Sequence, residues 1–158
     1  MTQTTQVEGL SFQDLGIIPP ILSQIEKAKF TTPSPIQAAA IPAGIAGQDV
    51  LGIAQTGTGK TLAFGIPMIQ HLSQKSGTGL VIVPTRELAL QVDEELFKFG
   101  RNLSLKTAVI IGGAAMGPQK MALRKNPHII IGTPGRIMDH MEQGTLRLNN
   151  ISILVLDE

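Results

Sequence analysis

The stretch 54–61, with the sequence AQTGTGKT, limits what this chain can fold into more than any other part of it. It follows the apolar run 49–53 and precedes the helix-compatible segment 62–72. This order predicts a buried strand, a glycine-rich loop and a helix, which is the arrangement of a phosphate-binding loop. Glycines let the backbone curl so that successive N–H groups point at phosphate oxygens, and the helix N-terminus adds a positive potential.

Two side chains at the end of this stretch suit phosphate and metal binding. Lys60 would place a positive charge on the β- and γ-phosphates, and the hydroxyl of Thr61 would bind magnesium. The strict pattern has glycine where this chain has Ala54, so an ordinary glycine-rich turn remains the plain structural alternative. The residues predicted to hold nucleotide are Thr56, Gly57, Thr58, Gly59, Lys60 and Thr61.

Composition narrows the class of protein. With 158 residues, 42% hydrophobic and 16% charged, the chain can bury one sizeable core and is expected to form one folded domain. The net charge of +1 gives no general basic surface, so any contact with nucleic acid has to be local. The absence of cysteine excludes disulfides and thiolate metal sites, and His71, His128 and His140 have no partner at metal-ligand spacing.

No targeting or membrane segment is evident. Residues 1–20 lack a basic region followed by an apolar core, and no apolar run approaches the ~20 residues of a membrane span. A cytoplasmic protein without a membrane partner is expected. The polar segment 1–9 is expected to be a flexible tail, and 10–158 a domain.

Between this tail and the glycine-rich stretch, the sequence predicts two helices. Apolar residues at helical spacing indicate one helix over 19–28. A second is expected to start at Pro35, with Ser34 as its N-cap, and to be interrupted at Pro42. Ser34 and Gln37 have the spacing of a capping box, which on the residues alone favours a structural role for Gln37 over a functional one.

The rest of the chain alternates apolar runs with helical segments. The runs 79–83, 105–111, 128–131 and 151–156 read as short buried strands. Helices are predicted from Thr85 to about 99, over 120–125 and from 137 to 141. This alternation predicts an α/β fold with a mostly parallel, doubly wound sheet and helices on both faces. The loops expected to converge at its carboxyl edge, where ligands bind, are 54–61, 84–86, 112–113, 133–136 and 157–158.

Charged residues at this edge suggest chemistry. Asp157 and Glu158 follow an apolar strand, as in the second half of an NTPase site, where Asp157 would hold magnesium and Glu158 would orient or deprotonate the attacking water. Two solvent-facing carboxylates are the alternative. Arg86 and Arg136 stand at helix starts, where a guanidinium and backbone N–H groups can hold a phosphate, or they are surface arginines without a role.

Taken together, these stretches resemble the first RecA-like domain of a DEAD-box RNA helicase, over about residues 12 to 158. Segment 30–37 resembles the Q motif of the family, and 54–61 its Walker A form, which begins with alanine. The RNA-facing motifs are matched by 84–89, 112–113 and 133–136, and 157–158 matches the start of the Asp-Glu-Ala-Asp motif. The resemblance implies ATP and Mg²⁺ as cofactors, and ATP hydrolysis coupled to local unwinding of RNA duplexes in the intact protein.

The resemblance also implies roles for single residues. Phe30 would stack on adenine, Gln37 would read the adenine edge, and Phe12 and Pro35 would support the adenine site. The catalytic residues would be Lys60, Asp157 and Glu158. The sugar-phosphate backbone of single-stranded RNA would be held by Pro84, Thr85, Arg86, Gly112, Gly113, Thr133, Pro134, Gly135 and Arg136.

Two departures from the family pattern affect these expectations. Lys29 stands where the family usually has glycine, which predicts a small effect on the loop before Phe30. The sequence ends inside the acidic motif, so a second RecA-like domain would be missing. This chain alone is therefore expected to bind nucleotide weakly and to hydrolyse it very slowly or not at all. An ATP-dependent RNA clamp and another P-loop nucleic-acid motor remain the alternative functions.

Overall fold

The computed structural model describes residues 9–158, so the predicted tail over 1–9 lies outside the described residues except for Gly9. The chain divides into two compact units, one ending at His71 and the other running from Leu72 to Glu158, which are described separately. Within the described part of the chain, no helix is long and apolar enough to cross a membrane.

The first unit is built from helices. A turn of 3-10 helix, η1 (Phe12–Leu15), precedes α1 (Pro19–Lys27), α2 (Pro35–Ile45) and α3 (Lys60–Gln74), the last of which continues into the second unit. The buried side chain of Gln70 on α3 accepts a hydrogen bond from the N–H of Ile18 (3.0 Å) and donates one to the carbonyl of Gly16 (3.1 Å). This amide satisfies both backbone groups of the η1–α1 junction and fixes it to α3.

The predicted interruption at Pro42 is wrong, because α2 continues to Ile45. A proline inside a helix removes one backbone donor, but the carbonyl of Pro42 still accepts a hydrogen bond from Ala46 (3.0 Å). Ile41, next to the proline, is completely buried. Packing of the apolar face therefore holds the helix together across the missing bond.

The strand predicted over 49–53 is also wrong. This segment forms no regular structure, and Leu51 and Ile53 are 92% and 90% exposed. No described strand is paired with it, and a strand exists only where a neighbour completes its hydrogen-bond ladder. An apolar run reports a tendency to be buried, but it carries no information about that neighbour.

The second unit contains a parallel sheet, as predicted. Its strands are β1 (Thr78–Ile82), β2 (Thr107–Ile110), β3 (Ile129–Gly132) and β4 (Ile151–Leu156), in the order β2-β3-β1-β4. Leu80 of β1 is in register with Ile130 of β3 on one side and with Leu154 of β4 on the other. All four carboxyl ends therefore lie at one edge of the sheet.

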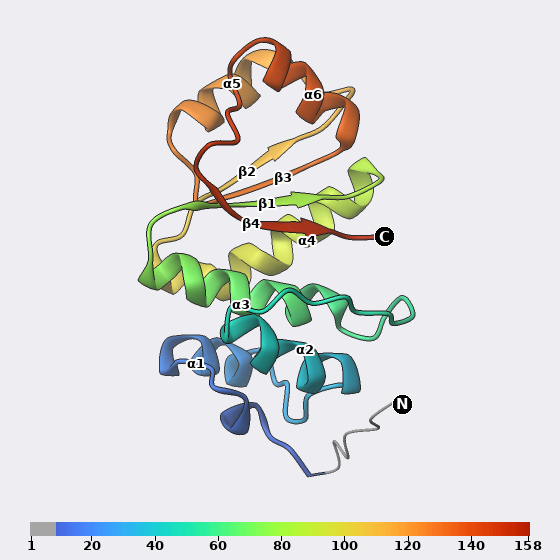
Figure 1. Cartoon of the computed structure of the whole chain (residues 1–158), viewed down its shortest axis with the longest axis vertical. Coiled ribbons are helices and arrows are strands. Elements are labelled where there is room, and N and C mark those ends of the chain that lie inside the picture. Colours follow the sequence, from blue (N-terminus) through green and yellow to red (C-terminus); the bar gives the residue numbers. More distant parts are fainter. Residues whose placement is uncertain (1–8) are drawn as a thin grey trace. The chain divides into compact units, whose positions relative to one another are not determined.

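Helices cover both faces of this sheet, which confirms the predicted α/β fold class. Figure 1 shows α4 (Arg86–Gly100) on one face and α5 (Met116–Arg124) and α6 (Pro134–Glu142) on the other. α5 and α6 begin a turn earlier than predicted. The core under α5 and α6 consists of Leu80, Ala108, Ile110, Leu123, Ile130, Ile137 and Leu146. On β4, by contrast, Leu154 and Leu156 are 57% and 72% exposed.

Candidate functional site

The predicted phosphate loop of the first unit has the backbone conformation that its glycines permit. Gly57 and Gly59 both have a φ of +83°, in the left-handed region that favours glycine. The hydroxyl of Thr58 donates to the carbonyl of Gln55 and closes a turn within the loop. A β-carbon on Gly59 would also collide with the side-chain amide of Gln37. Glycine at position 59 is thus required by both conformation and space.

The loop leads directly into α3. Lys60 and Thr61 are the first two residues of this helix and are half-buried, while Thr56 is exposed in the loop. The first N–H groups of a helix have no partners within it, and its N-terminus carries a partial positive charge. The start of α3 therefore supplies donors suited to an anion.

Gln37 connects α2 to this loop. Its backbone N–H donates to Ser34 Oγ (3.4 Å), and its Oε1 accepts from the N–H of Ser34 (2.9 Å), so the predicted capping box is present, with Pro35 at the first helical position. Its Nε2 donates to the carbonyl of Gly59 (3.3 Å). An amide side chain has two N–H groups and an oxygen with two lone pairs. The structural role therefore leaves capacity for a ligand, and adenine recognition by Gln37 stays a prediction.

Phe12 and Phe30 meet at a pocket of about 240 Å³ beside α1. Phe12 is 2% exposed and Phe30 46% exposed. Lys29, just before Phe30, has a φ of +62°. The N–H of Lys29 donates to the carbonyl of Glu26 (2.9 Å), and the N–H of Phe30 donates to the carbonyl of Ile25 (3.2 Å). The other residues lining this pocket are Gln13, Leu22, Ile25, Glu26 and Thr31, so Gln37 is not part of it.

In the second unit, Arg86 and Gly113 are brought together from loops after different strands. Thr85 caps α4 by accepting a hydrogen bond from the N–H of Leu88 (3.2 Å), which places Arg86 at the helix start, next to the exposed Pro84. The guanidinium of Arg86 lies against Gly113, where a β-carbon would be 2.5 Å from Nη1. Gly113 has a φ of +75° and follows the half-buried Gly112. The second glycine thus makes room for the arginine.

Arg136 connects the loop after β3 to the segment after β2. Its Nη1 donates to the carbonyl of Ala114 (2.8 Å) and to Gln119 Oε1 (3.2 Å), and its Nε lies 3.5 Å from Asp139 Oδ2. The side chain keeps 15% of its surface exposed. In the same loop, Thr133 occupies the N-cap position of α6, Pro134 the first helical position, and Gly135 has open space around its α-carbon.

Two residues of this network were not predicted from the sequence. Gln119 and His140 are 6% and 0% exposed. His140 Nε2 lies 2.9 Å from Gln119 Oε1, and its Nδ1 lies 2.7 Å from Thr145 Oγ1. Burial, followed by the positive charges of Arg136 and Lys120, lowers the pKa of His140 against the opposing effect of Asp139. The one signal in the sequence was the helical spacing of His140 from the apolar Ile137.

The acidic pair follows β4 at the carboxyl edge. The N–H of Asp157 bonds to the carbonyl of Ile82 (3.0 Å), which extends the ladder between β4 and β1. Asp157 is half-buried and Glu158 exposed. Among residues 9–158 no three histidine or acidic side chains cluster as metal ligands. The hydroxyl of Thr61 and the carboxylate of Asp157 are hard oxygen donors of the kind magnesium prefers. That the phosphate loop converges with these acids stays a prediction.

Known proteins resemble this chain over most of its length. A family profile described as DEAD/DEAH box helicase matches residues 34–158. The DEAD-box ATP-dependent RNA helicase CshA of Bacillus subtilis (strain 168) is 48% identical over 151 residues, which are 94% of this chain and 31% of the relative. The chain thus spans about a third of the length of the curated relatives that it matches.

Solved structures agree with these sequence matches. The crystal structure of a DEAD box protein from the hyperthermophile Methanococcus jannaschii superposes with a TM-score of 0.88 at 41% identity, covering 94% of this chain and 41% of that one. A hypothetical ATP-dependent RNA helicase from Sulfolobus tokodaii superposes with a TM-score of 0.82 at 34% identity, covering 88% of this chain and 40% of that one.

Proposed function

Since this chain belongs to the DEAD/DEAH box helicase family, we propose that residues 10–158 form the first RecA-like domain of an ATP-dependent RNA helicase. The whole protein would couple ATP hydrolysis to local unwinding of RNA duplexes, with a second RecA-like domain closing over both ligands. The curated relative named above is a DEAD-box ATP-dependent RNA helicase of Bacillus subtilis. We place the activity in the cytoplasm, where bacteria keep RNA and ATP.

The bond between Gln37 and Gly59 carries the nucleotide part of this proposal. It joins the residue proposed to read adenine to the loop proposed to hold the phosphates. Phe30 would stack on the adenine ring, with Phe12 behind it, and Lys60 would contact the terminal phosphates. Because the two regions share a hydrogen bond, base and phosphate recognition are connected within one unit.

Magnesium fits the same proposal. Thr61 and Asp157 would hold it, and it would neutralise charge that develops on the phosphate oxygens. Glu158 would orient the attacking water, or accept its proton, at the end of β4. Lys60 would act on the same phosphates from the start of α3.

RNA would bind along the carboxyl edge of the sheet in the second unit. Arg86 and Arg136 would contact phosphates, together with the backbone N–H groups at the starts of α4 and α6. Such contacts hold a strand without reading its sequence. They need only local positive charge, in agreement with a net charge of +1.

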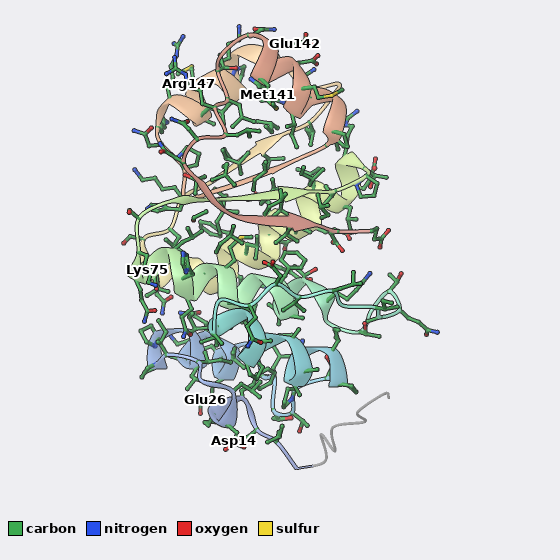
Figure 2. All side chains as sticks on the ribbon, viewed as in Figure 1. Asp14, Glu26, Lys75, Met141, Glu142 and Arg147 are labelled. Carbon is green, nitrogen blue, oxygen red and sulfur yellow. The ribbon has the colours of Figure 1, made fainter. Side chains whose placement is uncertain are left out.

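Calorimetric titration of this 158-residue chain with ATP, ADP and GTP, each with magnesium, tests the nucleotide site. We expect weak binding of ATP and ADP, no binding of GTP, and loss of ATP binding in Lys60→Ala. Lys75→Ala, at an exposed lysine near the end of α3 (Figure 2), is the matched control and should bind like the parent chain. Equal binding of all three nucleotides would contradict the roles of Phe30 and Gln37. Binding of none would contradict a nucleotide site within this chain alone.

A further inference from the structure

A buried chain of hydrogen bonds lies behind the guanidinium of Arg136. Both donors of Nη1 are occupied by protein oxygens, on Ala114 and Gln119. A guanidinium has five N–H donors in a rigid plane, so fixing one end of it sets the direction of the others. Nη2 carries two further donors, and the side chain remains partly exposed. The orientation in which these donors meet a ligand thus depends on what holds Nη1, together with the contact between Nε and Asp139 Oδ2 (3.5 Å).

The position of Gln119 is set by its own partners. Its Nε2 donates to the carbonyl of Ile111 (2.9 Å), so its Oε1 is the atom that faces Arg136 and His140. An amide oxygen only accepts, and His140 therefore carries its proton on Nε2. His140 Nδ1 then accepts from the hydroxyl of Thr145 (2.7 Å), whose single proton also faces the carbonyl of His140 (3.1 Å). The tautomer of His140, the amide of Gln119 and the contact with Arg136 determine one another.

Burying the polar side chains of Gln119 and His140 costs free energy, because both lose their contacts with water. Gln119 and His140 lie almost entirely inside the protein, where a polar group is tolerated only if it is hydrogen-bonded. Leucine at either position would avoid that desolvation. The lowered pKa of His140 keeps its ring neutral, so it can hold this place without adding a second charge beside Arg136. Packing alone therefore does not explain why polar residues, Gln119 and His140, occupy these buried positions.

We propose that Gln119 and His140 are positioning residues for RNA binding: they fix the guanidinium of Arg136 in the orientation that grips a phosphate of single-stranded RNA. Neither would touch RNA. The inference rests on the RNA-binding role proposed above for Arg136. It deepens that role by making the affinity for RNA depend on two side chains buried beneath the surface.

Binding of a fluorescein-labelled oligouridylate, followed by fluorescence anisotropy with a nonhydrolysable ATP analogue, tests this coupling. Loss of the hydrogen bond from Arg136 to Gln119 Oε1 predicts about tenfold weaker binding for Gln119→Met. His140→Leu removes the N–H that Gln119 Oε1 also accepts, and it should weaken binding by less than this factor because the lost bond joins two neutral groups. His140→Gln keeps an N–H for Gln119 and a carbonyl for Thr145, so it should restore affinity to within about twofold. Gln143→Met, at an exposed glutamine just after α6, is the matched control and should bind normally.

The decisive comparison uses Arg136→Ala as a background. If Gln119 acts through Arg136, Gln119→Met should weaken RNA binding in the parent chain and have no further effect once Arg136 is gone. Equal weakening in both backgrounds would overturn the proposal, because a general loss of packing does not depend on Arg136. If Arg136→Ala itself leaves RNA affinity unchanged, the function proposed for Arg136 fails.

A measurement without RNA distinguishes failure of the positioning role of Gln119 and His140 from failure of the RNA-binding role of Arg136. ¹⁵N NMR of the Arg136 Nε–H and of the His140 ring nitrogens reports the network directly. In the parent chain we expect one sharp Arg136 signal and a His140 ring that is protonated on Nε2. In Gln119→Met the Arg136 signal should shift or broaden. In His140→Gln it should be closer to the parent signal than it is in His140→Leu. An Arg136 signal that does not respond to Gln119→Met overturns the positioning role, whatever the RNA affinity.

Discussion

At the scale of single residues, His140 connects stability to pH. Its pKa in the folded protein is lowered by burial and by Arg136 and Lys120, while Asp139 opposes the shift. The unfolded chain therefore takes up the proton first, below the ordinary histidine pKa of about 6.5. The free energy of unfolding should fall as the pH drops from about 6.5 toward the lower folded-state pKa, and this residue should have no such effect above that range.

Thermal unfolding between pH 8 and pH 5 checks this expectation, and His140→Gln should flatten the pH dependence because glutamine does not titrate. His71→Gln, which also removes one histidine, is the matched control. The same slope in His140→Gln and in the parent chain would contradict a buried neutral His140. Comparing slopes cancels the contribution of carboxylates that titrate in both proteins.

Residue-scale prediction succeeded where a side chain acts near its own position in the sequence. The two residues of the capping box, Ser34 and Gln37, are three positions apart, so the motif was visible as spacing. Gln119 and His140 are 21 residues apart and meet only because α5 and α6 pack on one face of the sheet. A local sequence pattern cannot predict a contact between residues so far apart in the chain, so this part of the site became visible only in the structure.

At the scale of elements, the end of α1 shows the effect of one unusual residue. The bonds from Lys29 to Glu26 and from Phe30 to Ile25 form a Schellman motif, in which the residue with positive φ is commonly glycine. Lysine in this conformation costs roughly 1–2 kcal/mol. The sequence predicted a small effect at Lys29, and the left-handed backbone gives it a physical cause.

Lys29→Gly should raise the free energy of unfolding by about 1 kcal/mol, because the strain exceeds the extra chain entropy of glycine. Urea unfolding followed by circular dichroism measures it. Lys29→Ala removes the same charge and keeps the β-carbon, so it should leave stability nearly unchanged. A gain of similar size in both variants would assign the effect to charge instead of backbone strain.

Element-scale prediction was most accurate where two signals agreed. The cap at Thr85 and the apolar repeat after it placed α4 correctly, and each strand of the sheet lies within the predicted run or within a residue of it. The two wrong predictions, at Pro42 and over 49–53, depended on tertiary contacts around each segment, which a local sequence pattern does not contain. Packing preserved a helix that a local rule would end, and a run that looked like a strand had no paired neighbour.

At the scale of the whole molecule, β4 is an edge strand with apolar side chains in solvent. It pairs with β1 on one side, is last in the order of the described sheet, and exposes Leu154 and Leu156. Open edges of this kind pair readily with other chains. We expect the 158-residue chain to self-associate as its concentration rises.

Sedimentation velocity over a concentration series tests this expectation. Leu154→Lys should raise the dissociation constant by at least about tenfold, since burying a leucine contributes about 1.5–3 kcal/mol and lysine opposes edge pairing. Leu148→Lys, at a leucine of similar exposure outside the sheet, is the matched control. A chain that stays monomeric throughout, or one that responds equally to both changes, would contradict association through β4.

The parallel order of the sheet also has a consequence in time. β1 lies between β3 and β4 in the sheet, and both of these strands come after it in the sequence, so they are synthesised later. With β4 emerging about 70 residues later, synthesis at about 5–20 residues per second leaves β1 incomplete for roughly 4–15 seconds. During that wait Leu80 and Val81, almost fully buried in the finished protein, have nothing on their β4 side. The pace of the ribosome therefore sets how long chaperones can bind this apolar strand.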